Sequence, residues 1–242
     1  MKLKYRFLKI SLLIFLLGFL MNFAIKRHNN RPIDKMDIYI ENSDKIHFIT
    51  DKKVINVINQ SSKNGIKAEK IEDINIIKTE EILHSNPFIS KSNVYINLNG
   101  EINVTISQRI PIARVKTPKE EFYLDNEGNK FPLSLDFSFP CMLVGGDIQK
   151  NEYKDIAKLC KLISVDNLLK NHIIGIEKDK GNSYNFLLNI EGTYIEYGEI
   201  ENNRQKLTNL KEFYKQYLDF IGFDAYKKIS LKYENQIVAT KR

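Results

Sequence analysis

The first long hydrophobic run of the chain covers residues 7–25 and reads FLKISLLIFLLGFLMNFAI. At a helical rise of about 1.5 Å per residue, a run of this length crosses the roughly 30 Å hydrocarbon layer of a bilayer. A cleaved signal peptide is the alternative. However, residues 22–24 are Asn-Phe-Ala, a poor small-x-small cleavage site, and the run is longer than the usual signal-peptide core. The pattern therefore predicts an uncleaved transmembrane helix.

Polar residues flank this span, with residues 1–6 as a short tail and residues 26–36 as a linker. The chain up to residue 9 carries four basic side chains and no acid, whereas the far flank mixes basic residues with Asp34 and Asp37. Because basic residues favour the cytoplasmic side of a span, this bias slightly favours a cytoplasmic N-terminus.

After the linker, short alternating runs are interspersed with helical patterns. We expect strands at 37–40 and 45–49 around a turn at 42–44, and a helix that starts at Thr50 or Asp51 and ends at Asn64-Gly65. A second helix should start at Thr79 and end before Pro87. Strands at 92–98 and 101–107 follow, joined by Asn99-Gly100, a strong hairpin signal. This order predicts a three-stranded sheet with both helices on one face.

The second half of the chain is also mixed. Strands are expected at 112–116, 121–124, 141–144, 173–177, 184–190, 193–197, 229–233 and 236–241, with turns at 125–128, 191–192 and 234–235. Helices are expected at 152–163 and 201–221, the latter with an apolar stripe directed to the core and a polar face able to flank a partner. The predicted fold class is α+β: an N-terminal transmembrane helix, a small domain with three strands and two helices, then a β-rich domain with an antiparallel sheet and flanking helices.

Composition narrows the functional classes. The chain is 43% hydrophobic and 28% charged, as in an ordinary globular protein, and its net charge is +7. Eight of its 37 basic residues but one of its 30 acidic residues lie in 1–35, so residues 36–242 hold 29 of each. A neutral body lacks the surplus of Lys and Arg that a nucleic-acid-binding surface needs. The basic excess instead flanks the predicted span, where it meets lipid.

The sequence shows no recognisable catalytic or cofactor site. Its four histidines are far apart and none lies in a metal-binding motif, so solvated or half-buried histidine is the favoured interpretation. The runs that mark nucleophile elbows, penicillin-binding sites and phosphate-binding loops are missing. Cys141 and Cys160 could form one disulfide, but Cys160 lies in an apolar helical pattern and is expected to be a buried thiol. We predict no enzymatic activity, no cofactor and no metal.

Several ordered motifs resemble the bacterial cell-division protein family FtsQ/DivIB. The chain has Asn-Pro-Phe-Ile at 86–89, Gln-Arg-Ile-Pro-Ile-Ala-Arg-Val at 108–115, and Glu-Phe-Tyr-Leu-Asp at 121–125 followed by Gly128. The family's terminal I-D-L-R-Y hairpin is similar to residues 229–233 here, with Ser230 in place of the usual Asp and Lys232 in place of the usual Arg. The resemblance spans nearly the whole chain.

The resemblance implies a POTRA domain at 37–110 and an FtsQ-type β domain at 111–242. It also implies a non-enzymatic scaffold in the inner membrane at the division septum, with both domains periplasmic. The implied partners are FtsB and FtsL, bound directly, together with FtsW, FtsI and FtsK. In the family the terminal strand accepts an added strand from FtsB, which suits an open sheet edge. The implied partner-binding residues are Lys232, Tyr233, Gln236, Ile237, Val238, Ala239 and Thr240.

Other interpretations compete with this one. Ile229, Leu231 and Tyr233 share one face of a strand, and plain core packing is the favoured explanation for these three. The chain could also be another single-span POTRA protein of envelope transport, although it lacks the strand series of a membrane barrel. A membrane-anchored envelope enzyme would need a site built from scattered residues.

Overall fold

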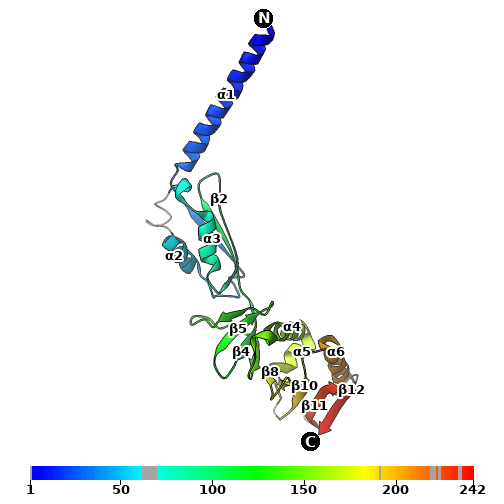
Figure 1. The fold of residues 1–242 in the computed structure, drawn as a ribbon. Coiled ribbons are helices and arrows are strands. Elements are labelled where there is room, and N and C mark those ends of the chain that lie inside the picture. Colours follow the sequence, from blue (N-terminus) through cyan, green and yellow to red (C-terminus); the bar gives the residue numbers. More distant parts are fainter. Residues whose placement is uncertain (1, 62–69, 191, 219–221, 223–224, 234–235) are drawn as a thin grey trace. The chain divides into compact units, whose positions relative to one another are not determined.

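The computed structural model describes residues 2–61, 70–190, 192–218, 222, 225–233 and 236–242. Apart from the N-terminal helix, the chain forms two folded domains, and its contacts divide it into compact units at 1–109 and 110–242 (Figure 1). We refer to these as unit 1 and unit 2. Among the described residues, one helix is long and apolar enough to cross a membrane, at 6–29.

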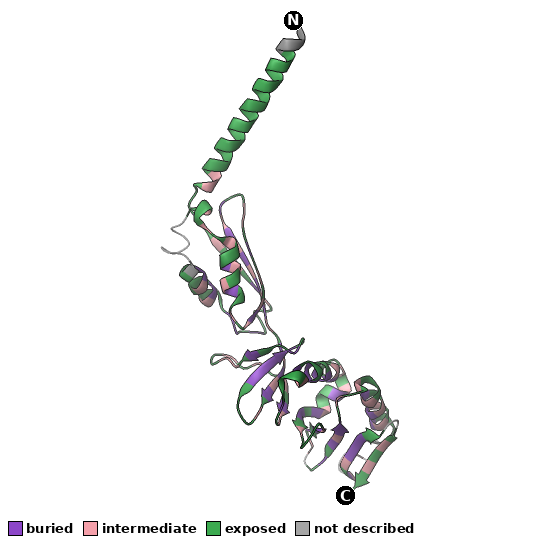
Figure 2. Ribbon diagram, in the orientation of Figure 1, coloured by how far each residue is buried: buried purple, intermediate pink, exposed green. Residues whose placement is uncertain are grey.

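That segment belongs to α1 (Lys2–Asn29), whose apolar side chains are exposed along the helix (Figure 2). The helix extends past the predicted span on both sides, because the flanking Lys and Arg residues are good helix formers. Exposed apolar side chains on every face of one helix need an apolar solvent, and a bilayer provides it.

The rest of unit 1 is a three-stranded sheet with two helices. Its elements are β1 (Met36–Glu41), α2 (Asp51–Ser61), the 3-10 turn η2 (Ile71–Asp73), α3 (Ile76–His84), β2 (Ile89–Ile96) and β3 (Ile102–Gln108). The strand order is β1-β3-β2, with β1 parallel and β2 antiparallel to the central β3. Val54 and Ile58 of α2, Leu83 of α3 and alternate residues of β3 are buried between the helices and the sheet. The predicted arrangement is confirmed.

The predicted strand at 45–49 is wrong. This segment contains turns and bends, although Ile46, Phe48 and Ile49 are buried. The buried side chain of Gln108 satisfies its backbone instead: Ile49 N donates to Gln108 Oε1 over 3.0 Å, and Gln108 Nε2 donates to Ile46 O over 2.7 Å. The apolar residues of this segment are buried as they would be in a strand, but its backbone bonds to a side chain and not to a neighbouring strand. Its sequence pattern therefore resembles that of a strand.

Two helix boundaries in unit 1 also bear on the predictions. The second helix begins three residues earlier than predicted, because Asn75 caps it by accepting a hydrogen bond from Lys78 N over 2.9 Å. The predicted end of the first helix, Asn64-Gly65, lies outside the described residues.

The hairpin between β2 and β3 is present, but its loop is longer than two residues. The strands separate after the Ile96–Ile102 pair, and Gly100 N donates to Asn97 O over 3.0 Å. Gly100 has φ of 83°, a backbone conformation that glycine adopts without strain.

Unit 2 is built on a nine-stranded sheet. Its strands are β4 (Pro111–Lys116), β5 (Glu121–Asp125), β6 (Lys130–Pro132), β7 (Met142–Gly145), β8 (Ile173–Lys178), β9 (Tyr184–Leu188), β10 (Tyr194–Gly198), β11 (Tyr226–Tyr233) and β12 (Gln236–Lys241). Its helical elements are the 3-10 turn η3 (Lys150–Glu152), α4 (Tyr153–Ser164), α5 (Asn167–His172), α6 (Asn203–Phe213) and the π-helical turn η4 (Tyr214–Leu218). The strand order is β12-β11-β10-β9-β8-β7-β4-β5-β6.

This sheet is mixed, which corrects the expectation of an antiparallel one. The pairs β4–β7, β7–β8 and β10–β11 are parallel. Parallel neighbours need a long crossover connection. The segment with α4 and α5 provides one between β7 and β8, and the segment with α6 provides another between β10 and β11.

The core of unit 2 contains the predicted helical stripes. Ile156, Cys160 and Ile163 of α4 and Leu207 and Leu210 of α6 are buried. The buried thiol of Cys160 is confirmed, and both cysteines are free in this structure. The predicted helix end at Ile221, the turn at 234–235 and residue 191 of the turn at 191–192 lie outside the described residues.

Candidate strand-addition surface

The last strand of the chain lies at one edge of the nine-stranded sheet. β12 pairs antiparallel with β11, and no other described strand pairs with it. In such a strand, alternate residues direct their N–H and C=O groups away from the neighbouring strand. β12 therefore presents unpaired backbone groups along a six-residue edge, which is a template for another strand.

The opposite edge of this sheet is far less suited to accept a strand. It is formed by β6, which has three residues and contains both Lys130 and Pro132. Short length, lysine and proline are the features that protect sheet edges from pairing, because proline has no N–H to donate. Of the two edges in unit 2, β12 is the open one.

Unit 1 has two further sheet edges, β1 and β2. The β2 edge is partly covered, because Val94 N donates to Glu80 Oε1 of α3 over 2.8 Å. β1 is six residues long and carries Asp37 and Glu41, whose charges disfavour an acidic partner strand.

The side chains of β12 alternate between two faces. Ile237 and Ala239 are half-buried and pack against the hydrophobic core of unit 2. Gln236, Val238 and Thr240 are exposed on the other face, where Val238 is an apolar contact available to a partner. Of the implied edge residues 237–240, Ile237 and Ala239 therefore hold the strand against the core. Val238 and Thr240 face outward.

Lys232 is held by a carboxylate from the neighbouring strand. Its Nζ donates to Glu196 Oε1 over 2.9 Å, and Lys228 Nζ lies 3.2 Å from Glu196 Oε2. The hydrogen bond from Lys232 is the main cause that lowers the pKa of Glu196 to about 2, against the opposing effect of burial. Glu196 pairs in register with Ser230, so a carboxylate lies beside the position where the family usually has Asp.

The expectation that Ile229, Leu231 and Tyr233 all face the core is wrong for the third residue. Ile229 and Leu231 are buried, but the side chain of Tyr233 is 59% exposed. The register of the β11–β12 ladder shifts between Ser230 and Tyr233, so strict alternation does not hold to the end of the strand. Tyr233 is therefore accessible beside Lys232.

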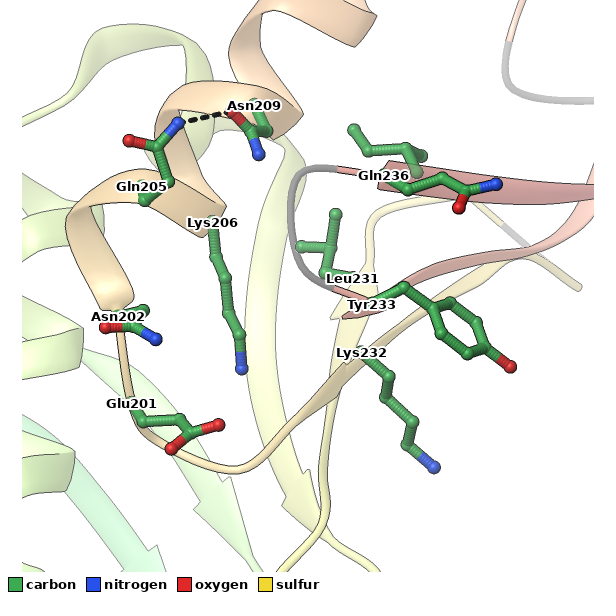
Figure 3. A pocket seen from close by; sticks show the side chains of 10 residues that line it. Glu201, Asn202, Gln205, Lys206, Asn209, Leu231, Lys232, Tyr233 and Gln236 are labelled. Atoms are coloured by element: carbon green, nitrogen blue, oxygen red, sulfur yellow. Dashed lines mark hydrogen bonds between the residues drawn. The ribbon is translucent and has the colours of Figure 1, made fainter.

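A groove of about 270 Å³ lies between α6 and the terminal hairpin (Figure 3). It is lined by Glu201 and Asn202 just before α6, by Gln205, Lys206 and Asn209 of α6, and by Leu231, Lys232, Tyr233, Gln236 and Ile237 of the hairpin. The resemblance did not identify the α6 residues individually. Their spacing over 202–209 fits one helical face and was the available signal.

One cation in this groove is already engaged. Lys206 Nζ donates to Glu199 O over 2.8 Å and lies 4.9 Å from the centre of the Tyr197 ring. Burial lowers the pKa of Lys206. Lys206 and Lys232 thus give the groove basic side chains whose positions are fixed by the protein before any partner arrives.

Within the described part of the chain, no three His, Cys, Asp or Glu side chains come together in a group that could hold a metal ion. His172 Nδ1 lies 2.8 Å from Leu168 O, and its ring packs against Tyr214. This histidine therefore contributes to packing, and the groove with its neighbouring edge is the site that the fold presents.

Comparison with known families agrees with this architecture. Residues 33–107 match the model of a POTRA-like domain. Residues 110–240, more than half of the chain, match the model described as FtsQ/DivIB, C-terminal related. No curated protein gave a match. With the apolar helix at 6–29 ahead of these two domains, the chain belongs to the FtsQ/DivIB family and is a scaffold-type protein of the cell-division machinery.

Proposed function

We propose that this protein recruits FtsB and FtsL and links them to the septal peptidoglycan synthesis machinery, and that its further partners are other division proteins such as FtsW, FtsI and FtsK. In this proposal FtsB adds a strand to β12, and no reaction is catalysed. The observation that supports it is the open edge of β12, six residues long and free of proline, in a sheet whose other edge is short and contains proline.

Backbone hydrogen bonds along β12 would supply the affinity of this strand addition, at about 0.5–1.5 kcal/mol each. Side chains would supply the specificity. The exposed ring of Tyr233 is a suitable anchor, because tyrosine is enriched among the residues that dominate interfaces. The groove between α6 and the hairpin carries both signs of charge, from Glu201, Lys206 and Lys232, and so favours a partner with polar side chains next to the added strand.

We further propose that the N-terminus is cytoplasmic and that both domains lie on the periplasmic side of the inner membrane. The basic tail before the span supports this orientation. The arrangement would place the β12 edge in the same compartment as the septal cell wall.

Two adjacent proline variants, Ile237→Pro and Val238→Pro, test the strand addition in the detergent-solubilised full chain. Because N–H groups alternate in direction along β12, one variant removes an outward donor and the other removes a bond to β11. We expect the variant that removes the outward donor to keep its thermal stability. Its Kd for FtsB, measured by calorimetric titration, should rise at least tenfold.

The matched control is Val238→Thr, which retains the backbone N–H and should bind FtsB with nearly unchanged Kd. A proline variant that keeps both its stability and its Kd for FtsB would contradict strand addition. Activity of the purified protein on peptidoglycan would instead support the envelope-enzyme alternative.

A further inference from the structure

The segment that follows α1 is fastened to one end of the POTRA-like domain. Ile71 N donates to Arg31 O over 3.0 Å, Pro32 forms an isolated β-bridge with Lys70, and Lys70 Nζ donates to Asn30 Oδ1 over 2.9 Å. Ile33 is buried, with 3% of its surface exposed. The residues just after α1 are therefore hydrogen-bonded to the POTRA-like domain.

The hairpin loop between β2 and β3 lies at this same end of the domain. β1 and β3 start side by side in parallel, and Ile102 N donates to Lys35 O over 2.9 Å. A Cβ atom on Gly100 would lie 3.3 Å from Ile71 Cδ1 and 3.8 Å from Pro32 O. The loop at 97–101 is thus adjacent to the point where the chain leaves α1.

The length of α1 sets the depth of this loop relative to the bilayer. The apolar run ends at Ile25, and four further helical residues to Asn29 add about 6 Å. The headgroup layer is roughly 5–8 Å thick on each side of the hydrocarbon. If α1 spans a bilayer along its normal, residues 30–32 and the hairpin loop beside them would lie at the level of the headgroups.

The side chains at this end suit that environment. Leu98 is 87% exposed in an otherwise polar loop that contains Asn97 and Asn99. Arg27, Arg31 and Lys70 are exposed nearby, and the acids beside them include Asp34 and Glu72, the latter 3.8 Å from Lys70. Basic side chains close to a bilayer attract anionic lipid, and an apolar side chain gains by leaving water.

We propose that this end of the POTRA-like domain is a lipid-binding surface. Leu98 enters the interfacial layer of the bilayer that α1 spans, while Arg27, Arg31 and Lys70 bind anionic headgroups. The surface fixes the domain against the membrane, independently of any strand added at β12.

The chain contains no tryptophan, so a single introduced Trp reports on its own position. The full-length Leu98→Trp variant is reconstituted into nanodiscs of anionic or zwitterionic lipid that carry headgroup-level doxyl quenchers. Tyr39→Trp is the matched control, because Tyr39 is 64% exposed on the same sheet but three residues, about 10 Å, beyond the start of β1.

We expect blue-shifted emission and strong quenching for Leu98→Trp, more in anionic than in zwitterionic discs, and little of either for Tyr39→Trp. Adding Arg27→Gln and Arg31→Gln to Leu98→Trp, which leaves Lys70 as the one cation of the proposed three, should reduce the difference between the two lipids. Quenching of Leu98→Trp no stronger than that of Tyr39→Trp would overturn the insertion of Leu98. Equal quenching of Leu98→Trp in anionic and zwitterionic nanodiscs would overturn the binding of anionic lipid.

Discussion

At the scale of single residues, Glu152 is a half-buried carboxylate with three hydrogen-bond donors around it. It accepts hydrogen bonds from the Tyr184 hydroxyl, from Lys178 Nζ over 2.7 Å and from Gln149 N over 2.8 Å. The side chains of Lys178 and Glu152 are 9% and 15% exposed. Burial alone would raise the pKa of Glu152, but the hydrogen bonds from Lys178 and Tyr184 outweigh it, and the pKa is lowered.

Replacing Glu152→Gln should therefore lower the free energy of unfolding of unit 2 by about 2 kcal/mol at neutral pH, because Lys178 loses its ionic partner. A carboxylate whose pKa is lower in the folded state stabilises the fold above its unfolded pKa, and this contribution disappears as pH falls through the folded pKa. The difference between wild type and variant should thus shrink in acid. Urea unfolding at a series of pH values measures it.

The exposed Asp155–Lys158 pair on α4 provides the control for this measurement. Its side chains are 55% and 68% exposed, so Asp155→Asn should change stability by less than about 1 kcal/mol. An equal loss in both variants would show that the burial of Glu152 contributes nothing.

At the scale of elements, Gly128 fixes the contact between the β5–β6 hairpin and α4. Its φ is 80°, and an added Cβ would lie 2.7 Å from Lys154 Cα, which is backbone and cannot move aside alone. Gly128→Ala should destabilise unit 2 by about 2–4 kcal/mol through strain and overpacking together. Thermal unfolding of the variant measures this loss.

Gly181 separates the two effects, because its φ of 86° is similar but no atom lies within 4 Å of its added Cβ. Gly181→Ala should cost only the conformational part, about 1 kcal/mol. If both variants lost the same stability, the contact with α4 would not contribute.

The start of α3 gives a matching prediction in unit 1. Asn75→Ala removes the acceptor of the Lys78 N–H and should lower stability by about 1 kcal/mol, whereas Asn75→Asp keeps an acceptor and should stay near wild type. Chemical denaturation followed by circular dichroism distinguishes them. Equal losses for Ala and Asp would argue against the cap.

These elements show what the sequence can and cannot predict. The helix at 152–163 was predictable, because its apolar residues recur with helical spacing and all face one core. β6 was not, since a three-residue strand with one buried side chain has no periodicity to detect. The segment 45–49 misled the prediction because the amide of Gln108, about sixty residues away, satisfies its backbone.

The candidate site also has one part that the sequence predicts, the terminal strand, and one part that it does not, the groove. The alternating residues at 229–233 and 236–241 predict the terminal hairpin, and the strand order then places β12 at an edge of the sheet. The groove depends instead on α6 lying beside β12, which brings residues 201–209 next to 231–237. No local pattern encodes that contact, so the sequence predicted only a polar helix face able to flank a partner, and the fold identified its individual side chains.

At the scale of the whole molecule, charge and function are separated along the chain. The basic excess lies around α1, whereas the two domains together are neutral, with 29 basic and 29 acidic residues in 36–242. Because the domains carry no net charge, we expect specific contacts to decide which partners they bind. The electrostatic attraction of the basic excess instead acts on the membrane surface. The proposed strand addition uses the neutral region alone, whereas the proposed lipid surface combines Arg27 and Arg31 of the basic region with Lys70 and Leu98 of the domain.

The proposed orientation of the chain rests on the same charge distribution and gives the last prediction. Alkaline phosphatase, which folds only outside the cytoplasm, should be active when fused after Arg242, and a green fluorescent protein fused there should stay dark. Replacing Lys2, Lys4 and Arg6 by Gln removes most of the charge bias, because the far flank keeps Lys26 and Arg27. The variant should divide between both orientations, with phosphatase activity per molecule falling and fluorescence rising. An inactive phosphatase fusion of the unmodified chain would place the domains in the cytoplasm. That result would contradict both the proposed orientation and septal wall assembly by this protein.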